Sequence, residues 1–405
     1  MLRVAFLACL FLPASTAAQN DPSIPLTQYT GQRFVHDVRS ASLGMAGAFL
    51  PDATPLALVE NPARLAESGV VPQLRVTGSG HPNYVGINGI STAHLAASYA
   101  VGPAVLGAVV SNQSFGTQTL TDELGESLGE AEFGDGAVAF SAAARFGRPQ
   151  ARLDVGLTGR VSQIRTFSGF GTGSIRRDRA TQPSVDVGVI GSVDVIGRQA
   201  LLKGAITPTL TVSAGYTQRY IGPDFEYGDE EPPGLQPRAA SLGTSLQFGA
   251  DTELNGQRLC AFEIEVAVEA EAELEYTEIN PNGAETRGSG VLVGQMRVRD
   301  AILGTSADPF VTGQRGVRLT AAETLWVGRG ETDEGGLGGR PYGRSAWGVG
   351  LSAGGALRLV GALQDRSDLV ELGRRFDLTL GYAELGGING FSGSRLGSLG
   401  VAARL

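Results

Sequence analysis

The amino-acid sequence predicts an all-β protein, a transmembrane antiparallel β-barrel of about 14 strands, since single-chain bacterial barrels have even strand numbers. Three observations lead to this prediction. Apolar and polar side chains alternate from about Leu74 to the last residue, and a period of two is typical of strands. Many of these stretches are about 9–13 residues long, the length that a strand needs to cross a bilayer. The connections between them tend to alternate between short and long, as in outer-membrane barrels.

The N-terminus predicts a secretory signal peptide over residues 1–18. Arg3 supplies the positive charge, residues 4–12 form a short apolar run, and small residues at 16–18 provide a cleavage site. We therefore expect the mature chain to begin at Gln19. Cys9 lies inside the apolar run, which leaves Cys260 as the single cysteine of the mature chain and excludes an intrachain disulfide. Downstream, no apolar run is long enough for a transmembrane helix.

A separate N-terminal segment is predicted over residues 19–70, ahead of the barrel at 71–405. Its central part, 40–66, is rich in small and apolar residues and is compatible with short helices. Three prolines, at 51, 55 and 62, divide it into short turns because proline interrupts a helix. Asp52 and Asn61 are suited to cap two of these turns.

The clearest strand pattern lies at 261–279, with the sequence AFEIEVAVEAEAELEYTEI. On a strand, its apolar and acidic residues separate onto opposite faces, whereas on a helix they would spread around the axis. We expect the glutamates to face a wet lumen, with Arg297 and Arg299 on the next candidate strand supplying counter-charges. The apolar face comprises Phe262, Ile264, Val266, Val268, Ala270, Ala272, Leu274 and Tyr276, and the acidic face Glu263, Glu265, Glu269, Glu271, Glu273 and Glu275.

Other strands and loops follow from the same reasoning. Alternation is clear at 153–158, 347–353, 375–382 and 399–405, and the last of these predicts a closing strand at the C-terminus, because a barrel leaves no edge in lipid. Short connections are expected at 102–103, 147–151 and 251–257, and long ones at 112–136, 165–183 and 219–238. The alternation falters between Asp300 and Arg374. A soluble β-sandwich or propeller would explain the alternation, but not the strand length, the loops or the terminal strand.

No motif indicates an enzyme, a cofactor or a metal site. Residues 350–354 match the nucleophile motif G-x-S-x-G, but we place them within a strand, and all three histidines lie upstream. The glycines at 169, 171 and 173 are not followed by a helix that could hold a phosphate, and the acidic cluster 229–231 is interpreted as a solvated loop more readily than as a calcium site. A formal charge of −9 argues against a nucleic-acid partner.

Residues 39–66 resemble the opening of the PorV/PorQ family, which is related to the FadL-type outer-membrane transporters. The matching motifs are R-S-A-S-L-G-M-A-G-A at 39–48, D-A-T at 52–54 and N-P-A-R-L at 61–65. Ala46 stands where the family has glycine, and Glu60 where it often has an aromatic residue. Weaker matches lie at 121–125, 133–135, 220–223 and 235–237.

The resemblance implies a 14-stranded barrel whose N-terminal segment folds toward the lumen, located in the cell outer membrane. It further implies a component of type IX secretion that binds secreted cargo proteins through the loops at 112–136, 165–183 and 219–238 and works with a translocon. The alternative is a FadL-type channel for hydrophobic small molecules, with residues 40–66 as a hatch. A second alternative is a secreted structural β protein.

Overall fold

The computed structural model describes residues 38–404 except 51–53, 69–71, 84–89, 122–126, 169–175, 197–205, 224–237, 280–284, 290–291, 295, 306–310, 335–341 and 387–393. The predicted signal peptide, Asp52, the glycines at 169–173 and the acidic cluster 229–231 therefore lie outside the described residues, as does most of the loop at 219–238.

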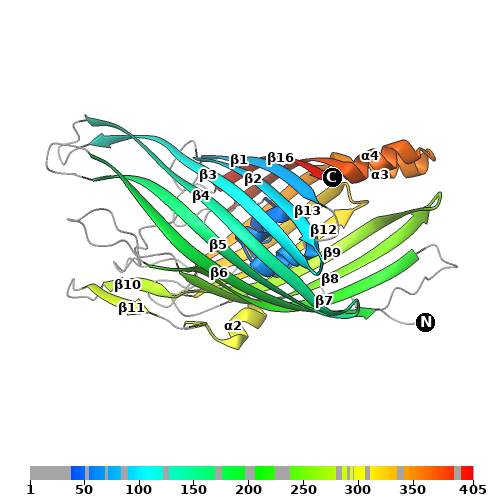
Figure 1. The fold of residues 1–405 in the computed structure, drawn as a ribbon, viewed down its shortest axis with the longest axis horizontal. Helices are drawn as coiled ribbons and strands as arrows, with labels where there is room; N and C mark the ends of the chain where they lie inside the picture. Colours follow the sequence, from blue (N-terminus) through cyan, green and yellow to red (C-terminus); the bar gives the residue numbers. More distant parts are fainter. Residues whose placement is uncertain are drawn as a thin grey trace.

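Fourteen antiparallel strands close into a barrel (Figure 1), which confirms the predicted fold class. Each strand pairs with its neighbours along the chain, β9 pairs with β12, and β1 pairs with β16 to close the wall. The closed order excludes a sandwich or a propeller. The strands are β1 (Gln73–Asn83), β2 (Ile90–Val101), β3 (Ala104–Thr121), β4 (Ser127–Arg148), β5 (Ala151–Ser168), β6 (Arg176–Ile196), β7 (Ile206–Ile221), β8 (Ala239–Leu254), β9 (Gln257–Glu273), β12 (Val311–Ala321), β13 (Leu325–Glu334), β14 (Tyr342–Ser352), β15 (Phe376–Leu385) and β16 (Ser394–Arg404).

The strands differ in length, and this corrects two of the predicted loops. Strand β4 has 22 residues and β6 has 21, well beyond the 9–13 expected. The described parts of 112–136 and 165–183, which were expected as long loops, instead form paired extensions of β3 with β4 and of β5 with β6. Here the hydrogen-bonded ladder continues through polar sequence, where alternation no longer marks a strand. The predicted closing strand is confirmed as β16, which pairs with β1 from Gln73 to Asn83.

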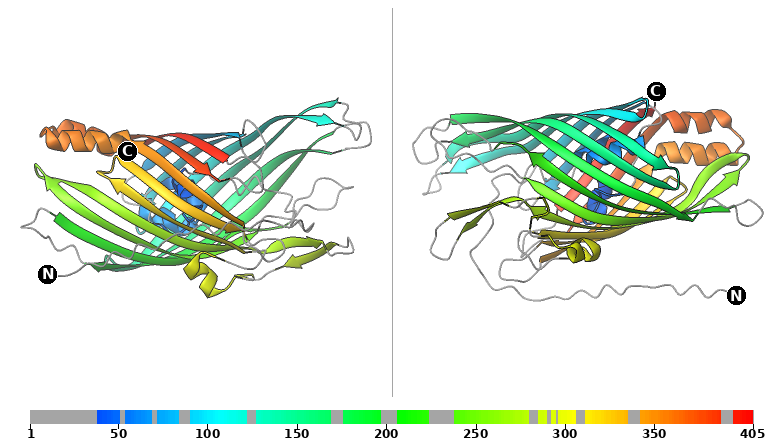
Figure 2. Two further views of the ribbon diagram at one scale, coloured as in Figure 1. Left: turned by 180° about the vertical axis from the view of Figure 1, so that it is seen from behind. Right: turned by 60° about the horizontal axis from the view of Figure 1, so that its bottom comes forward.

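The two ends of the barrel differ. At the short-turn end, β2–β3, β4–β5, β8–β9 and β12–β13 are joined by tight turns, whereas the other connections at this end are longer. The opposite, long-loop end carries the small hairpin of β10 (Glu275–Ile279) and β11 (Glu285–Ser289) and the helix α2 (Val298–Leu303). Helix α2 lies outside the wall, where Ala301 packs with Ala270 and Ala272 of β9 (Figures 1 and 2).

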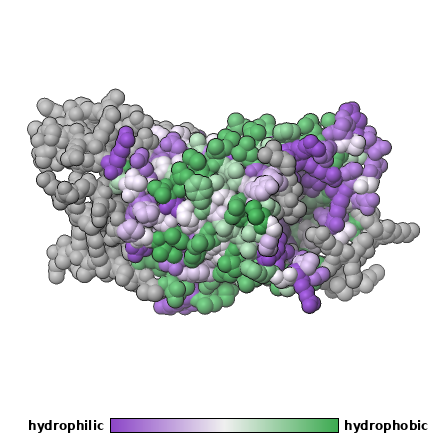
Figure 3. Space-filling view, viewed as in Figure 1, coloured by the Kyte–Doolittle hydropathy of each residue, from purple (hydrophilic) through white to green (hydrophobic). Residues whose placement is uncertain are grey.

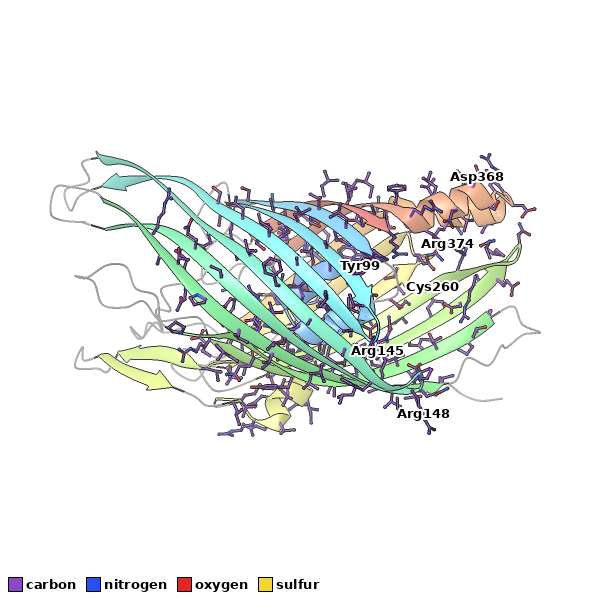
Figure 4. All side chains as sticks on the ribbon, viewed as in Figure 1. Tyr99, Arg145, Arg148, Cys260, Asp368 and Arg374 are labelled. Atoms are coloured by element: carbon purple, nitrogen blue, oxygen red, sulfur yellow. The ribbon has the colours of Figure 1, made fainter. Side chains whose placement is uncertain are left out.

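A helical hairpin between β14 and β15 was not predicted. Helices α3 (Ala353–Leu363) and α4 (Ser367–Arg375) extend from the short-turn end along the barrel axis (Figure 2). The strand expected at 347–353 therefore ends at Ser352, and this insertion explains in part why the alternation falters between 300 and 374. Figure 4 shows Arg374 and Asp368 on the hairpin and Arg145 and Arg148 near the β4–β5 turn, so charged side chains gather at this end.

The outer surface of the wall is apolar. Alternate residues of β2 to β6 point outward and leave large side chains exposed, among them Phe140 at 66% and Leu157 at 53%. The hydrophobic colour spans the middle of the molecule in Figure 3, while the end that carries the α3–α4 hairpin is hydrophilic. This is the distribution that a bilayer requires of a transmembrane barrel.

Candidate functional site: a plugged lumen

The lumen holds the N-terminal segment, which we call the plug (residues 38–50 and 54–68 as described). It consists of α1 (Val38–Ser42), η2 (Pro55–Val59) and η3 (Pro62–Ser68) with turns between them, and it lies within the strands in Figures 1 and 2. Its apolar side chains are almost entirely buried: Leu43, Leu58 and Leu65 are 0% exposed. The helical pieces expected at 40–66 are thus present, although they are short.

Glycines of the wall allow the plug to approach the strands closely. A Cβ atom built at Gly316 would lie 2.5 Å from the Cα of Leu43, and one at Gly243 would lie 2.6 Å from the ring of Phe49. Both distances are well below ordinary van der Waals contact. The wall glycines that face the plug in this way are Gly107, Gly156, Gly188, Gly215, Gly243, Gly316, Gly328, Gly330, Gly348 and Gly381.

A few hydrogen bonds fix the plug backbone to the wall. Glu269 of β9 accepts from the backbone N–H of Ala48 at 3.3 Å. The hydroxyl of Ser245 donates to the carbonyl of Phe49 at 2.9 Å, and that of Thr332 donates to the carbonyl of Gly44 at 2.8 Å. These bonds satisfy backbone groups of a buried, irregular segment, which would otherwise be costly.

Asn61 organises the second half of the plug. Its side-chain oxygen accepts from the N–H of Ala63 at 3.0 Å, in agreement with its predicted capping role, and its side-chain nitrogen donates to the carbonyl of Ala48 at 3.1 Å. At the short-turn end, Glu67 pairs with Arg145 at 2.7 Å and with Arg152 at 3.4 Å. The plug is therefore tied to the wall near its C-terminal end by charge as well as by packing.

One part of the inner wall is apolar. We call it the apolar strip: Ala96 of β2, Val105 and Val109 of β3, and Ala139 and Ala143 of β4, all at most 5% exposed. Plug residues Leu56, Leu58, Val59, Leu65 and Ala66 cover it. In most barrels with a wet interior such inward positions are polar, so an apolar strip on β2–β4 depends on the plug to shield it from water.

Elsewhere the inner wall is polar and charged. The predicted inward orientation of the β9 glutamates is confirmed for Glu263, Glu265, Glu269 and Glu271. They do not face a wide aqueous lumen, because the plug and neighbouring side chains cover them. Their partners differ from those expected. Arg318 of β12 pairs with Glu265, and Arg219 of β7 pairs with Glu271.

The prediction that Arg297 and Arg299 supply counter-charges to the β9 glutamates is wrong. Both are exposed at the start of α2, outside the barrel, and Arg299 lies 3.5 Å from its neighbour Asp300. The backbone N–H of Arg297 donates to the carboxylate of Asp300 at 2.9 Å, which starts a helix where the alternation suggested a strand. Gly304 then ends α2 in a left-handed conformation (φ 61°).

The G-x-S-x-G match at 350–354 also has a different local structure from the one expected. Ser352 lies at a strand-to-helix junction and not within a strand. Its hydroxyl accepts from the N–H of Gly355 at 2.9 Å and donates to Asp377 at 2.8 Å, so Ser352 caps α3. The described part of the chain contains no cluster of three or more metal-ligating side chains, and none of its helices could cross a membrane.

The structure brings together only some of the residues that carry the resemblance to the PorV/PorQ family. Positions 39–48 and 61–65 form the plug, whereas Tyr220 lies at the end of β7 beside Arg160 of β5. The guanidinium of Arg160 donates to the Tyr220 hydroxyl at 3.2 Å and pairs with Asp186 at 2.7 Å. This buried ion pair, like the wall glycines, was missed from sequence because its members come from distant strands.

Comparison with known proteins gave matches among solved structures only. No family model and no curated protein matched, so the resemblance to the PorV/PorQ family and the type IX interpretation receive no support from them. The toluene transporter TbuX of Ralstonia pickettii has 12% identity and a TM-score of 0.45, over 90% of this chain and 97% of its own. The CymD monoaromatic hydrocarbon channel has 10% identity and a TM-score of 0.41, over 90% and 96%.

A Pseudomonas aeruginosa FadL homologue has 9% identity and a TM-score of 0.38, over 91% of this chain and 98% of its own. The three neighbours are thus a transporter, a channel and a homologue of FadL. At this level of similarity their ligands remain properties of those proteins.

Proposed function

We propose that this protein is an outer-membrane channel for small, largely apolar molecules and that the plug is its gate. The observation that carries the proposal is the apolar strip on β2–β4, which is covered by a separate piece of chain and not by side chains of the wall. If the plug withdraws from β2–β4, an apolar track opens along the inside of the barrel.

The way the plug is held supports a gate. The plug approaches wall glycines closely, and among the described residues Glu269, Ser245, Thr332 and Arg145 of the wall hydrogen-bond to it. A segment held in this way can move without unfolding the wall, whose own ladder of backbone hydrogen bonds is complete without it. An apolar molecule needs such a route because it must leave water and pass a barrier of polar headgroups.

The orientation follows from the connections. In outer-membrane barrels short turns face the periplasm and long loops face the outside. The α3–α4 hairpin and the Glu67 ion pairs would then lie on the periplasmic side, and the extensions of β3–β6 would lie at the cell surface. The cargo-binding interpretation expected long loops at 112–136 and 165–183, where the described chain is largely paired strand, and no observation favours that interpretation over a channel.

A reversible lock on the plug tests the proposal. A Cβ built at Gly381 lies 3.3 Å from the Cβ of Val38, close to the roughly 3.5–4.5 Å that a disulfide spans. The variant Val38→Cys/Gly381→Cys, made with Cys260→Ser, should lose uptake of a radiolabelled alkylbenzene into intact diderm cells when oxidised and regain it on reduction. The two single-cysteine variants, treated identically, control for the oxidant.

Two results would count against the proposal. Equal uptake by the oxidised and reduced double variant would remove the gating role of the plug. Uptake by cells with the unlocked protein that is no faster than uptake by cells without it would remove the channel function itself.

A further inference from the structure

A small polar cavity lies inside the barrel between the plug and the strands β2–β5 and β7. We call it the polar recess. Its volume is about 30 Å³, which is room for a group of one or two heavy atoms, since one water molecule needs at least about 10–15 Å³. Its wall comprises His94, Ser111, Asn112, Gln113, Asp135, Gly136, Ala137, Arg160, Ser162 and Tyr220, and its remaining side is Val59 of the plug.

Among the described residues that line the polar recess, Gln113 and Ser162 each have a buried polar atom without a hydrogen-bond partner. Gln113 is 6% exposed and Ser162 is 4% exposed. Neither the Nε2 of Gln113 nor the Oγ of Ser162 has a hydrogen-bond partner within the described residues. An unsatisfied buried group costs about 1–3 kcal/mol, so the fold would gain by replacing either residue with an apolar one. Their presence points to a molecule that enters the polar recess and accepts or donates hydrogen bonds there.

The charges around the polar recess favour an uncharged group. Arg160 is the cation in its wall, and its guanidinium is already paired with Asp186 at 2.7 Å and bonded to the Tyr220 hydroxyl. Asp135 contributes a carboxylate to the same wall. A carboxylate ligand would therefore meet one negative charge and a cation that is neutralised elsewhere, whereas a hydroxyl or carbonyl group would meet the amide of Gln113 and the hydroxyl of Ser162 at no such cost.

The apolar residues beside the polar recess indicate that a ligand also needs an apolar part. Val59 contributes both to the polar recess and to the apolar cluster that covers the apolar strip. Along β3 and β4, Val109 and Ala139 of the strip lie four residues from Gln113 and Asp135, on the same inward face. The polar recess is thus the end of the apolar track that a displaced plug would uncover.

We propose that the polar recess binds the uncharged polar group of a small amphiphile, an alcohol, phenol or ketone, whose apolar body lies along the apolar strip. This inference rests on the proposed channel function and narrows its substrate class from apolar molecules in general to those with one neutral hydrogen-bonding group. Gln113 and Ser162 are its specificity-determining residues.

Binding of three probes that share a para-methylphenyl body to the detergent-purified full-length protein tests this inference. Calorimetry should show that para-methylbenzyl alcohol binds about tenfold more tightly than para-xylene, as expected for two net hydrogen bonds, and more tightly than para-methylbenzoate. Gln113→Leu and Ser162→Ala should each lower the affinity for the alcohol about threefold, the double variant should lower it to that for para-xylene, and all three should leave the affinity for para-xylene unchanged. Ser162→Ala removes a single atom, so the test stands even if the leucine variant does not fold.

Gln163→Leu is the matched control. Gln163 follows Ser162 on β5 but is exposed on the outer face, where it bonds to Thr181 at 3.4 Å, so its replacement should change none of the three affinities. Equal binding of the alcohol and para-xylene, or tighter binding of the benzoate, would overturn the inference and leave the polar recess as a site for water. Alkylbenzene uptake by the disulfide-locked variant tests the channel separately. If oxidation blocks that uptake but the purified protein does not prefer the alcohol, this inference is refuted and the channel function stands.

Discussion

Replacing Gly316 with alanine should loosen the plug without damaging the barrel. Gly316 lies on β12, and a Cβ there would lie 2.5 Å from both the Cα and the carbonyl oxygen of Leu43. Ordinary contact between such atoms is about 3.5–4.0 Å, so the plug backbone must retreat by about 1 Å. Backbone atoms cannot turn aside as a flexible side chain can. Overpacking of this kind costs about 1–3 kcal/mol.

That cost falls on the state in which the plug is seated and disappears when the plug is withdrawn. It should raise the population of the withdrawn state roughly 5- to 150-fold, at tenfold per 1.4 kcal/mol. Leu50, which is 2% exposed and packs with Leu43, is a suitable reporter. In a Cys260→Ser background, Leu50→Cys should react with a membrane-impermeant maleimide faster by that factor when Gly316→Ala is present.

Gly159→Ala is the control for this experiment. Gly159 is also a strand glycine, on β5, but a Cβ there meets no atom within 4 Å, so the labelling rate should not change. Retention of the heat-dependent gel shift would show that both barrels are intact. If Gly316→Ala and Gly159→Ala gave the same labelling rate, close approach of plug and wall would not hold the plug in place.

Three further outcomes follow from contacts described above. Ser352→Ala removes the cap of α3 and should destabilise the α3–α4 hairpin by about 0.5–2 kcal/mol, seen as faster hydrogen exchange in the hairpin with unchanged exchange in the barrel strands. Arg318→Met leaves Glu265, 1% exposed, without its cation and should cost about 3–5 kcal/mol in urea unfolding, whereas Arg318→Met with Glu265→Leu should recover most of the loss. The hydrogen bond from Arg366 lowers the pKa of Asp368 to about 2, so carbon NMR should find the titration midpoint of this carboxylate near pH 2. Any stability that the carboxylate adds is present above about pH 4 and is lost as the pH falls toward 2. A midpoint near 3.9 would refute the hydrogen bond.

The transmembrane wall was predictable because lipid imposes its pattern on the sequence residue by residue. The alternation at 261–279 gave the strand β9 and the inward orientation of its glutamates, and the pattern at 399–405 gave the closing strand. Both depend on the two faces of a single strand, which a period of two records directly. The extensions of β3–β6 lie outside that constraint and carry no apolar face, so the alternation predicts loops there.

The helices around the wall were missed for a different reason. The apolar residues at 356, 357, 359, 360 and 363 follow the spacing of a helix, but the strand pattern leading up to Ser352 concealed where the period changes. At α2, the combination of Asp300 and Gly304 was a usable signal for the beginning and end of a helix. The partners of the glutamates were beyond local reasoning, since Arg219 and Arg318 are brought to β9 by the closure of the wall.

The candidate site was predictable only in part. The prolines at 55 and 62 and the small residues at 40–48 indicated a segment of short turns, but its place inside the barrel came from resemblance. The polar recess could not be predicted, because Gln113, Ser162 and Val59 belong to elements far apart along the chain. Their proximity depends on the register of β3, β4 and β5, which a single sequence does not record.

Because glycines of the inner wall face the plug, the strands and the N-terminal segment have separate roles. The strands form a cylinder whose inner surface is bare backbone where glycines face the plug, and the plug, residues 38–50 and 54–68, fills the space beside them. Under the proposed channel function, substitutions in this short stretch would change how the opening is closed, while the outer surface that contacts lipid and the pairing of β1 with β16 stay as they are.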